Sequence, residues 1–231
     1  MTLPVAIFLH GANGCAAEME PLATLLQPYA RLIAVNLPGH GGRPVPQKIG
    51  IDAAADDVIA VLDGESIDRA FFVGYSLGGY TAARIAQRFP ERTHGFCAIA
   101  TKFVFDVPTV TKWVYLAQPD RLAESTRGPQ MLQAHGEGWR AVTEANQRLF
   151  MDLGANPVMR EDDFRAITRP ALLVNSNRDP LVEWSETLRI GSLIPGAQLV
   201  MFHGLAHPMR NVPVDPVARS IGEWMLRATP S

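Results

Sequence analysis

The chain has 231 residues, of which 47% are hydrophobic and 19% charged, and its formal net charge at pH 7 is -2. This composition is typical of a folded globular protein and excludes a disordered chain. There is no basic block and no apolar run near the ~20 residues of a membrane span, so neither nucleic acid nor a membrane is an expected partner.

The N-terminus has no basic region before its short apolar run, which argues against a signal peptide and predicts a cytoplasmic protein. The two cysteines, Cys15 and Cys97, lack metal-type spacing and are expected to be free, buried thiols. No metal and no cofactor is expected. The expected partner is a small-molecule substrate, and both a monomer and a homodimer are compatible with the sequence.

Strands and helices alternate along residues 1–100. Residues 3–9 form a continuous apolar run, typical of a strand covered on both faces, and they end in a tight polar loop. A second predicted strand leads into another polar loop at residues 36–42. The predicted strands cover residues 3–9, 32–35, 70–74 and 95–100, and the predicted helices cover residues 18–30, 51–62 (capped by Asp52 or a neighbour) and 77–88.

Residues 72–79, with the sequence FVGYSLGG, combine the end of a buried strand, a Gly-x-Ser-x-Gly turn and the start of a helix. Such a turn is a nucleophile elbow, in which a strained backbone raises the serine hydroxyl from the sheet. The following helix should end at Phe89–Pro90 and point its positive end at Ser76. The pattern alone occurs by chance in roughly one chain in twenty of this composition. A catalytic role for Ser76 therefore also requires a base and an acid elsewhere in the chain.

The alternation breaks at residues 101–168 and then resumes. Within this insert, amphipathic helices are predicted around Trp139–Phe150 and over residues 111–117. Further strands at 171–174 and 198–202 and helices at 183–193 and 216–227 complete the chain. We therefore predict one α/β domain over 1–231, a mainly parallel sheet with helices on both faces, whose core is 1–100 and 169–231 and whose inserted lid is 101–168.

Ligands of such sheets bind beyond the carboxyl ends of the strands, where the polar residues of this chain gather. A serine hydroxyl at neutral pH needs a base within hydrogen-bond reach, and histidine suits this task. His203 and His207 both follow the last strand. We predict His207 as the base, because it lies in the loop beyond the strand and can reach back over Ser76.

The base needs an acid that fixes its tautomer. Asp179 is the only carboxylate of the loop after the 171–174 strand and is the predicted acid, although an Asp-Pro pair also favours an ordinary turn. Asp106, after the fourth strand, is a rival, and Glu183 is a more distant one. The chain order Ser76, Asp179, His207 is the order of an α/β nucleophile-elbow enzyme.

Acyl transfer also needs donors for the oxyanion. We predict the backbone N–H of Leu77 and a second N–H from the first loop, from Ala12 or else from Asn13. An ordinary turn explains the first loop equally simply. Aromatic residues of the insert could line an acyl site or only bury the insert on the sheet, and the pocket candidates are Asn13, Tyr75, Trp113, Trp139 and Phe150.

Together these motifs resemble the α/β-hydrolase superfamily, in the branch of small single-domain serine hydrolases with a helical lid that includes esterases and a menaquinone-pathway lyase. The resemblance implies Ser76 as nucleophile, Asp179 as acid, His207 as base and a lid over 101–168. Dehalogenases and epoxide hydrolases of this fold carry aspartate at the position of Ser76, so those reactions are not expected. One departure is that the family's first strands are expected to be missing, because the chain begins almost at the strand before His10. The matching motifs are LHGA at 9–12, LPGHG at 37–41, GYSLGG at 74–79, the segment 173–179 and GLAH at 204–207.

The expected activity is hydrolysis of a small ester, thioester or lactone through an acyl-enzyme. Two alternatives stay open. One is a lyase or carbon–carbon bond hydrolase that uses the same three residues to move protons, and the other is a small-ligand-binding protein of the same fold without catalysis.

Overall fold

A six-stranded sheet, with the strand order β2-β1-β3-β4-β5-β6, forms the centre of the computed structural model, which describes residues 3–204, 206, 207 and 209–229. Every strand pair is parallel, so the predicted α/β class is confirmed and the sheet is wholly rather than mainly parallel. The strands are β1 (Val5–Leu9), β2 (Arg31–Val35), β3 (Ala70–Tyr75), β4 (Thr93–Ile99), β5 (Ala171–Ser176) and β6 (Gln198–Phe202).

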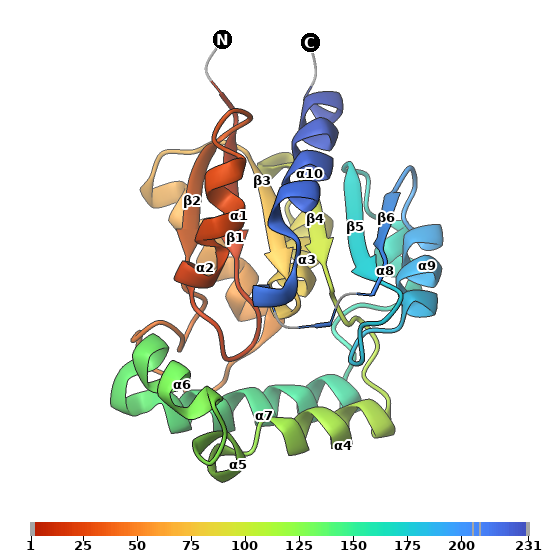
Figure 1. Cartoon of the computed structure of the whole chain (residues 1–231). Coiled ribbons are helices and arrows are strands. Elements are labelled where there is room, and N and C mark those ends of the chain that lie inside the picture. The colour runs from red at the N-terminus through yellow and green to blue at the C-terminus, as the bar shows by residue number, and fades with distance from the viewer. Residues whose placement is uncertain (1–2, 205, 208, 230–231) are drawn as a thin grey trace.

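Helices cover both faces of the sheet (Figure 1). One face carries α1 and α10, and the other carries α2, α3 and α9. No helix among the described residues has both the length and the hydropathy needed to cross a bilayer. These helices are α1 (Glu20–Leu25), α2 (Ile51–Gly64), α3 (Leu77–Arg88), α9 (Trp184–Leu193) and α10 (Val214–Ala228), with 3-10 turns η1 (Ala16–Met19), η2 (Pro90–Arg92) and η4 (Met209–Asn211).

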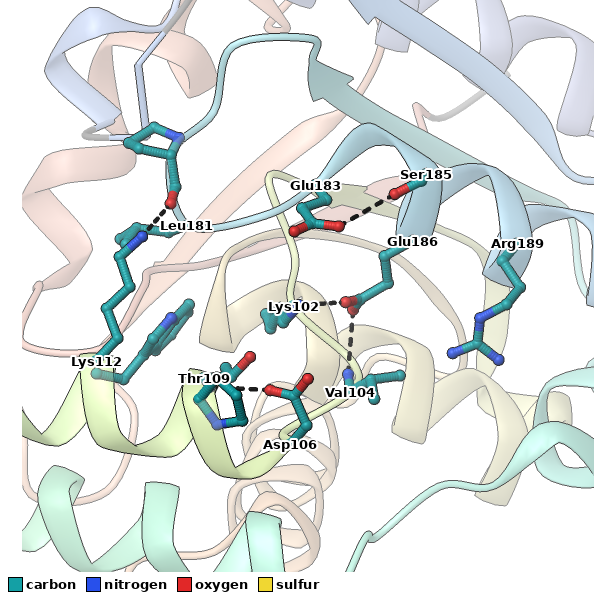
Figure 2. Close-up of a pocket in the computed structure, with 13 residues that line it drawn as sticks. Lys102, Val104, Asp106, Thr109, Lys112, Leu181, Glu183, Ser185, Glu186 and Arg189 are labelled. Atoms are coloured by element: carbon teal, nitrogen blue, oxygen red, sulfur yellow. Dashed lines mark hydrogen bonds and ion pairs between the residues drawn. The ribbon is translucent and has the colours of Figure 1, made fainter.

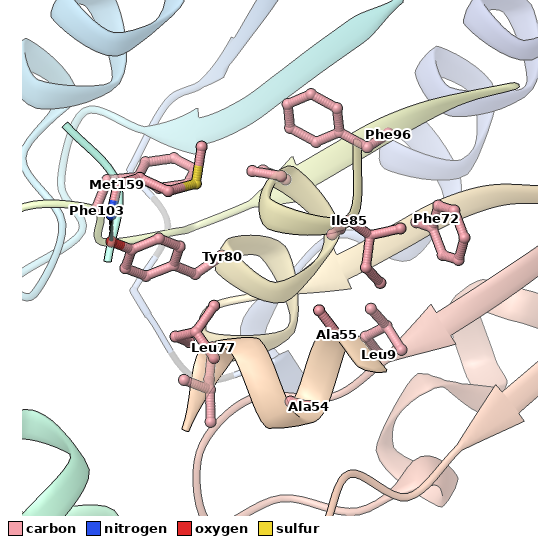
Figure 3. Close-up of a cluster of buried hydrophobic side chains, with 14 of the residues drawn as sticks. Leu9, Ala54, Ala55, Phe72, Leu77, Tyr80, Ile85, Phe96, Phe103 and Met159 are labelled. Atoms are coloured by element: carbon pink, nitrogen blue, oxygen red, sulfur yellow. Dashed lines mark hydrogen bonds between the residues drawn. The ribbon is translucent and has the colours of Figure 1, made fainter. Parts of the chain in front are cut away.

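The side chains of β3 show why both faces are covered. Successive residues of a strand point to opposite faces, and in β3 all of them are apolar or glycine. Phe71 and Val73 enter the buried cluster under α1 and α10, whereas Phe72 enters the cluster under α2 and α3. Figure 3 shows Phe72 beside Ile85 of α3 in this second cluster. The continuous apolar run therefore needs a helical layer on each side.

Five helices lie between β4 and β5 in the chain. Four of them, α4 to α7, form a layer across the carboxyl ends of the strands (Figure 1). This layer shares buried residues such as Phe105 and Leu149 with the cluster under α2 and α3, so it belongs to the same hydrophobic core. The five are α4 (Val107–Leu116), α5 (Pro119–Ala123), α6 (Arg127–His135), α7 (Trp139–Ala155) and α8 (Glu161–Arg165), with the 3-10 turn η3 (Gly136–Gly138) between α6 and α7.

Two local expectations are wrong. The helix predicted over 18–30 is a 3-10 turn followed by a helix that ends at Leu25. Pro28 explains this, because a proline disfavours helical geometry in the residue before it. The N-cap of α2 is Gly50, without a side-chain cap. The Asp52 carboxylate instead pairs with Arg84, 2.7 Å away.

Both cysteines are free, as predicted, but only Cys97 is fully buried, whereas Cys15 is half-buried. Burial raises the pKa of the Cys97 thiol far above its ordinary value. Residues 1–2, which are part of the N-terminal segment judged not to be a signal peptide, lie outside the described residues, as does Leu205 of the GLAH motif.

Candidate active site

Ser76 occupies the turn between β3 and α3. Its φ of 52° and ψ of -113° form a conformation that residues with a Cβ rarely adopt. Its N–H donates to the carbonyl oxygen of Ile99 at 2.8 Å, which ties the turn to β4. A Cβ on Gly74 would lie 2.1 Å from the Gly78 oxygen, and one on Gly78 would lie 2.2 Å from the Leu9 oxygen. Only glycine therefore fits on either side of this serine.

A chain of hydrogen bonds joins Ser76, His207 and Asp179. The Nε2 atom of His207 lies 3.3 Å from the Ser76 Oγ, and its Nδ1 lies 2.8 Å from Oδ2 of Asp179. Ser76 is 4% exposed and His207 8%, and the Asp179 side chain is 2% exposed. When Nδ1–H donates to the carboxylate, Nε2 is the ring nitrogen that can accept the serine proton.

Further hydrogen bonds fix the two partners of the serine. Oδ1 of Asp179 accepts from the backbone N–H groups of Leu181 at 2.8 Å and Val182 at 3.0 Å. The Tyr75 hydroxyl donates to the backbone carbonyl of His207 at 2.5 Å. Burial raises the pKa of Tyr75 far above its ordinary value, so this hydroxyl remains a donor. Tyr75 thus supports His207 from the α1–α10 side of the sheet.

The rival acid and base candidates have other contacts. His203 is exposed, and its Nδ1 accepts from the Asn177 side-chain amide at 2.9 Å. Asp106 is the N-cap of α4, and hydrogen bonds from the side chain and the backbone N–H of Thr109 lower the pKa of its carboxyl. Glu183 stands before α9. Within the described residues, none of the three rivals hydrogen-bonds to the serine or to the imidazole of the chain above.

The predicted oxyanion donors lie on two segments that adjoin Ser76. Leu77 is the first residue of α3, so its N–H has no carbonyl one turn earlier within the helix. The first loop is tight, since the N–H of Gly14 donates to the Gly11 carbonyl at 3.1 Å. A Cβ on Gly11 would come within 3.3 Å of the Ser76 Cβ, which shows how closely this loop, with Ala12, approaches the serine.

Three buried imidazoles, His10, His40 and His135, lie side by side next to this loop. Their ring centroids are 5.0 Å apart for His10 and His40 and 5.7 Å apart for His40 and His135. Burial lowers the pKa of His10 to about 3, that of His40 to about 4, and that of His135 below its ordinary value, so all three are neutral at pH 7. Their ring nitrogens bond to the Gly11 carbonyl and Leu37 N–H (His10), the Pro38 carbonyl and Asn146 amide (His40), and the Gly41 N–H and Asn13 carbonyl (His135).

The pocket candidates occupy four different surroundings. The ring of Trp113 lies 6.0 Å from that of His207, so Trp113 borders the imidazole, and the ring of Phe150 packs behind it, 5.1 Å from that of Trp113. Asn13 is 7% exposed and belongs to the polar cluster next to the first loop. Trp139 lies in a separate small cluster between α5, α6 and α7. The ring of Tyr75 lies 5.4 Å from that of His207, on the side of the sheet that carries α1 and α10.

A groove of about 480 Å³ lies between α4 and the segment that leads into α9 (Figure 2). Figure 2 shows Glu186 of α9, which lines this groove, bonded to the Lys102 ammonium and to the Val104 N–H. Trp113 forms part of its wall, and the same ring contacts His207. The groove therefore approaches the Ser76–His207–Asp179 chain through one aromatic side chain.

Sequence reasoning did not identify His135 or Asn146. One signal was available, because Asn146 interrupts the apolar face formed by Val142, Leu149 and Phe150 of α7. A polar residue on a buried helix face needs hydrogen-bond partners, and Asn146 finds them outside its helix. No comparable pattern marks His135, whose partners come from loops more than 90 residues away in the sequence.

Comparison with known proteins identifies the family of the chain. The model of the Alpha/beta hydrolase family matches residues 6–220. The pimeloyl-[acyl-carrier protein] methyl ester esterase of Neisseria meningitidis is 43% identical over 93 residues, which are 40% of this chain and 35% of that enzyme. The 2-succinyl-6-hydroxy-2,4-cyclohexadiene-1-carboxylate synthase of Escherichia coli is 34% identical over 100 residues, which are 43% of this chain and 38% of that enzyme.

Each of these two matches thus spans about a third of the relative's length. Among solved structures, the enol-lactonase of Burkholderia xenovorans superimposes with a TM-score of 0.77 at 19% identity. The superposition covers 98% of this chain and 92% of the lactonase, and at this identity it supports the shared fold alone.

Proposed function

This chain belongs to the alpha/beta hydrolase family, and we propose that it is a serine esterase that cleaves a small ester, thioester or lactone. The observation that carries the proposal is the continuous hydrogen-bond chain from Ser76 Oγ through His207 to Asp179. The esterase named among its relatives supports the same class of reaction. In this proposal residues 101–168 serve as the lid of a single domain.

In the proposed reaction, the Ser76 oxygen attacks the carbonyl carbon of the substrate while Nε2 of His207 takes the hydroxyl proton. The carbonyl π electrons move to its oxygen, which the N–H groups of Leu77 and Ala12 stabilise. The tetrahedral intermediate then breaks the bond to the leaving oxygen, or to sulfur in a thioester, and this atom takes the proton from His207 as a hydroxyl or thiol. Water then attacks the acyl-enzyme through the same proton transfers and releases the carboxylic acid and free Ser76.

The roles of the partners follow from their contacts. Asp179 orients the imidazole and balances the positive charge that His207 carries in each half-reaction. Its second oxygen, held by two backbone N–H groups, keeps the carboxylate from turning away. Trp113 beside His207, with Phe150 packed on the Trp113 ring, favours an apolar acyl or alkoxy group at this end of the site.

A fluorophosphonate probe tests the nucleophile. We expect stoichiometric labelling of the wild type at neutral pH and none of Ser76→Ala. Ser66→Ala is the matched control, because Ser66 is an exposed serine that also has a positive φ, of 54°, and this variant should label normally. An unlabelled wild type would contradict a serine esterase, and equal labelling of Ser76→Ala would mean that the probe reacts at another residue and that Ser76 is not the nucleophile.

The second candidate is a lyase or carbon–carbon bond hydrolase, favoured by the similarity to the Escherichia coli synthase. Such an enzyme would use Ser76 and His207 to move protons without a stable acyl-enzyme. Mass spectrometry after mixing with a nitrophenyl ester separates the two candidates. A serine esterase gains the mass of the acyl group on the peptide that contains Ser76, and a screen over acyl-chain lengths then defines the substrate.

A further inference from the structure

Two side chains of the insert hold Asn13, the residue that follows the proposed oxyanion donor Ala12. Asn146 of α7 donates one amide hydrogen to the Asn13 side-chain oxygen at 2.8 Å. His135 of α6 donates from Nε2 to the Asn13 backbone carbonyl at 3.2 Å. Asn13 is therefore bonded through both its side chain and its backbone, and both partners come from the layer that covers the strand ends.

The same two residues also hold the second polar loop of the sheet edge. The other amide hydrogen of Asn146 goes to Nε2 of His40 at 3.0 Å. Nδ1 of His135 accepts from the backbone N–H of Gly41 at 3.0 Å. Each insert side chain thus bridges the loop after β1 and the loop after β2. These bonds require one tautomer of each neutral ring, with the proton on Nδ1 of His40 and on Nε2 of His135. Each bond of the arrangement therefore has a defined donor and acceptor.

Three of these four bonds are buried, and the Gly41–His135 bond is partly buried. Asn146 and His40 are 0% exposed, His135 is 4% exposed and Asn13 7%. Water cannot readily replace a lost partner at such a site, so removing one bond leaves a buried polar group unsatisfied. We call the set of Asn13, His40, His135 and Asn146 the loop clamp.

The backbone of Asn13 explains why the clamp matters for chemistry. Asn13 has a φ of 60°, in the left-handed region, which asparagine adopts more often than other residues with a Cβ but which is still a minority conformation for it. The N–H of Ala12 lies in the peptide unit between Gly11 and Ala12, one unit before the Asn13 N–H, and it must point at the oxyanion to within a few tenths of an ångström. Bonds from outside the loop therefore help to hold a backbone conformation on which the donor geometry depends.

We propose that His135 and Asn146 are positioning residues that hold the oxyanion loop in its active geometry, so that docking of the insert completes the oxyanion hole. The inference rests on the proposed esterase function and deepens it. The insert then has a second task besides shaping the substrate pocket. It couples the position of α6 and α7 to the ability of the site to stabilise negative charge.

Gln147 provides a matched control for Asn146. It is the next residue of α7, and its side-chain amide donates to the Val114 carbonyl of α4 at 2.9 Å. This bond joins two helices of the insert and does not reach the first loop. Asn146→Ala and Gln147→Ala therefore each remove one amide from the same helix, but only the first removes a bond of the clamp.

The test compares a nitrophenyl ester with the corresponding thionoester, in which sulfur replaces the carbonyl oxygen. Sulfur accepts hydrogen bonds weakly, so the oxyanion hole assists thionoester turnover much less than ester turnover. We expect Asn146→Ala to lower kcat for the ester on the order of 10²-fold with little change in KM. The ester-to-thionoester ratio of kcat should fall at least about tenfold, whereas Gln147→Ala should keep both kcat and the ratio.

A pair of His135 variants keeps the test decisive if Asn146→Ala unfolds. His135→Gln retains an N–H donor for the Asn13 carbonyl and should recover much of the kcat and of the ratio that His135→Ala loses. An unchanged ratio in a folded Asn146→Ala or His135→Ala variant with an active wild type would overturn the clamp but leave the esterase proposal intact. Absence of ester turnover in the wild type would overturn both.

Discussion

The two oxygens of Asp179 have different tasks. Oδ2 bonds to the imidazole of His207, and Oδ1 accepts two backbone N–H groups of its own loop. An asparagine at position 179 can still accept the two backbone N–H groups through its amide oxygen. Its amide nitrogen then faces the imidazole of His207 and offers a hydrogen in place of an acceptor. The role of the carboxylate is therefore separable from the shape of the loop.

We predict that Asp179→Asn lowers kcat on the order of 10⁴-fold while the protein stays folded, because the amide stabilises the wrong tautomer of His207. Steady-state kinetics with a nitrophenyl ester and thermal unfolding measure the two effects. Asp106→Asn is the control, since Asp106 only caps α4 and asparagine caps helices equally well. Near-normal activity of Asp179→Asn, or a similar loss in Asp106→Asn, would argue against Asp179 as the acid.

At the scale of single residues, the sequence predicts those functional residues that lie in a recognisable local pattern. Ser76 lies in a turn with glycines at both ends, and Asp179 and His207 each follow a strand, so strand prediction alone brings them to one edge of the sheet. His135 and Asn146 are different. Their partners depend on how α6 and α7 lie over the loops, which is a tertiary arrangement without a local pattern.

The element that places the nucleophile is α3, and it does so by lying unusually close to β1. A Cβ on Gly78, in the first turn of α3, would lie 2.2 Å from the Leu9 oxygen and 2.7 Å from the His10 oxygen. Both atoms belong to the backbone at the end of β1, so they cannot move aside as a flexible side chain could. The contact fixes the start of the helix directly below Ser76.

We predict that Gly78→Ala lowers the free energy of unfolding by about 4 kcal/mol or more, because the helix must shift away from the sheet. Urea unfolding followed by fluorescence measures this. Gly64→Ala is the matched control at the last residue of α2, where an added Cβ meets nothing within 4 Å. It should be neutral or stabilise by up to about 1 kcal/mol. Equal effects of the two variants would refute the close-approach argument.

Elements of the core could be predicted more fully than those of the insert. The strands and α3 have strong signals, namely continuous apolar runs and a helix ended by Phe89–Pro90. In the insert, α4 and α7 are partly visible as amphipathic stretches, but α5 and α8 have five residues each and bury few side chains. Such short helices are stabilised by packing rather than by their own sequence, so periodicity does not reveal them.

At the scale of the whole molecule, the sheet edge combines a reactive site with a neutral, buried polar cluster. Three imidazoles are buried there with pKa values below their ordinary value. Desolvation is the largest cause for each, and for His10 the neighbouring His40 adds to it. The folded state therefore resists protonation of His10 and His40, whereas the unfolded chain accepts protons on both near pH 6.5.

This difference links the stability of the fold to pH. The unfolded state binds more protons than the folded state between about pH 6.5 and the folded pKa values of about 3 for His10 and about 4 for His40. The free energy of unfolding is thus fully retained above about pH 6.5 and falls as the pH falls through that window. By about pH 4, each of the two residues should remove roughly 3 kcal/mol.

Urea unfolding at a series of pH values between about 7 and about 4 measures this loss. Other groups also titrate in the range, so the informative quantity is the difference in slope between the wild type and His40→Gln, which removes one of the two buried imidazoles and relieves its effect on His10. We expect a clearly smaller dependence on pH in the variant, even if its stability at pH 7 is lower. An identical slope would mean that His40 is protonated equally in the folded and unfolded states, and the buried imidazoles would then not be what makes this fold sensitive to acid.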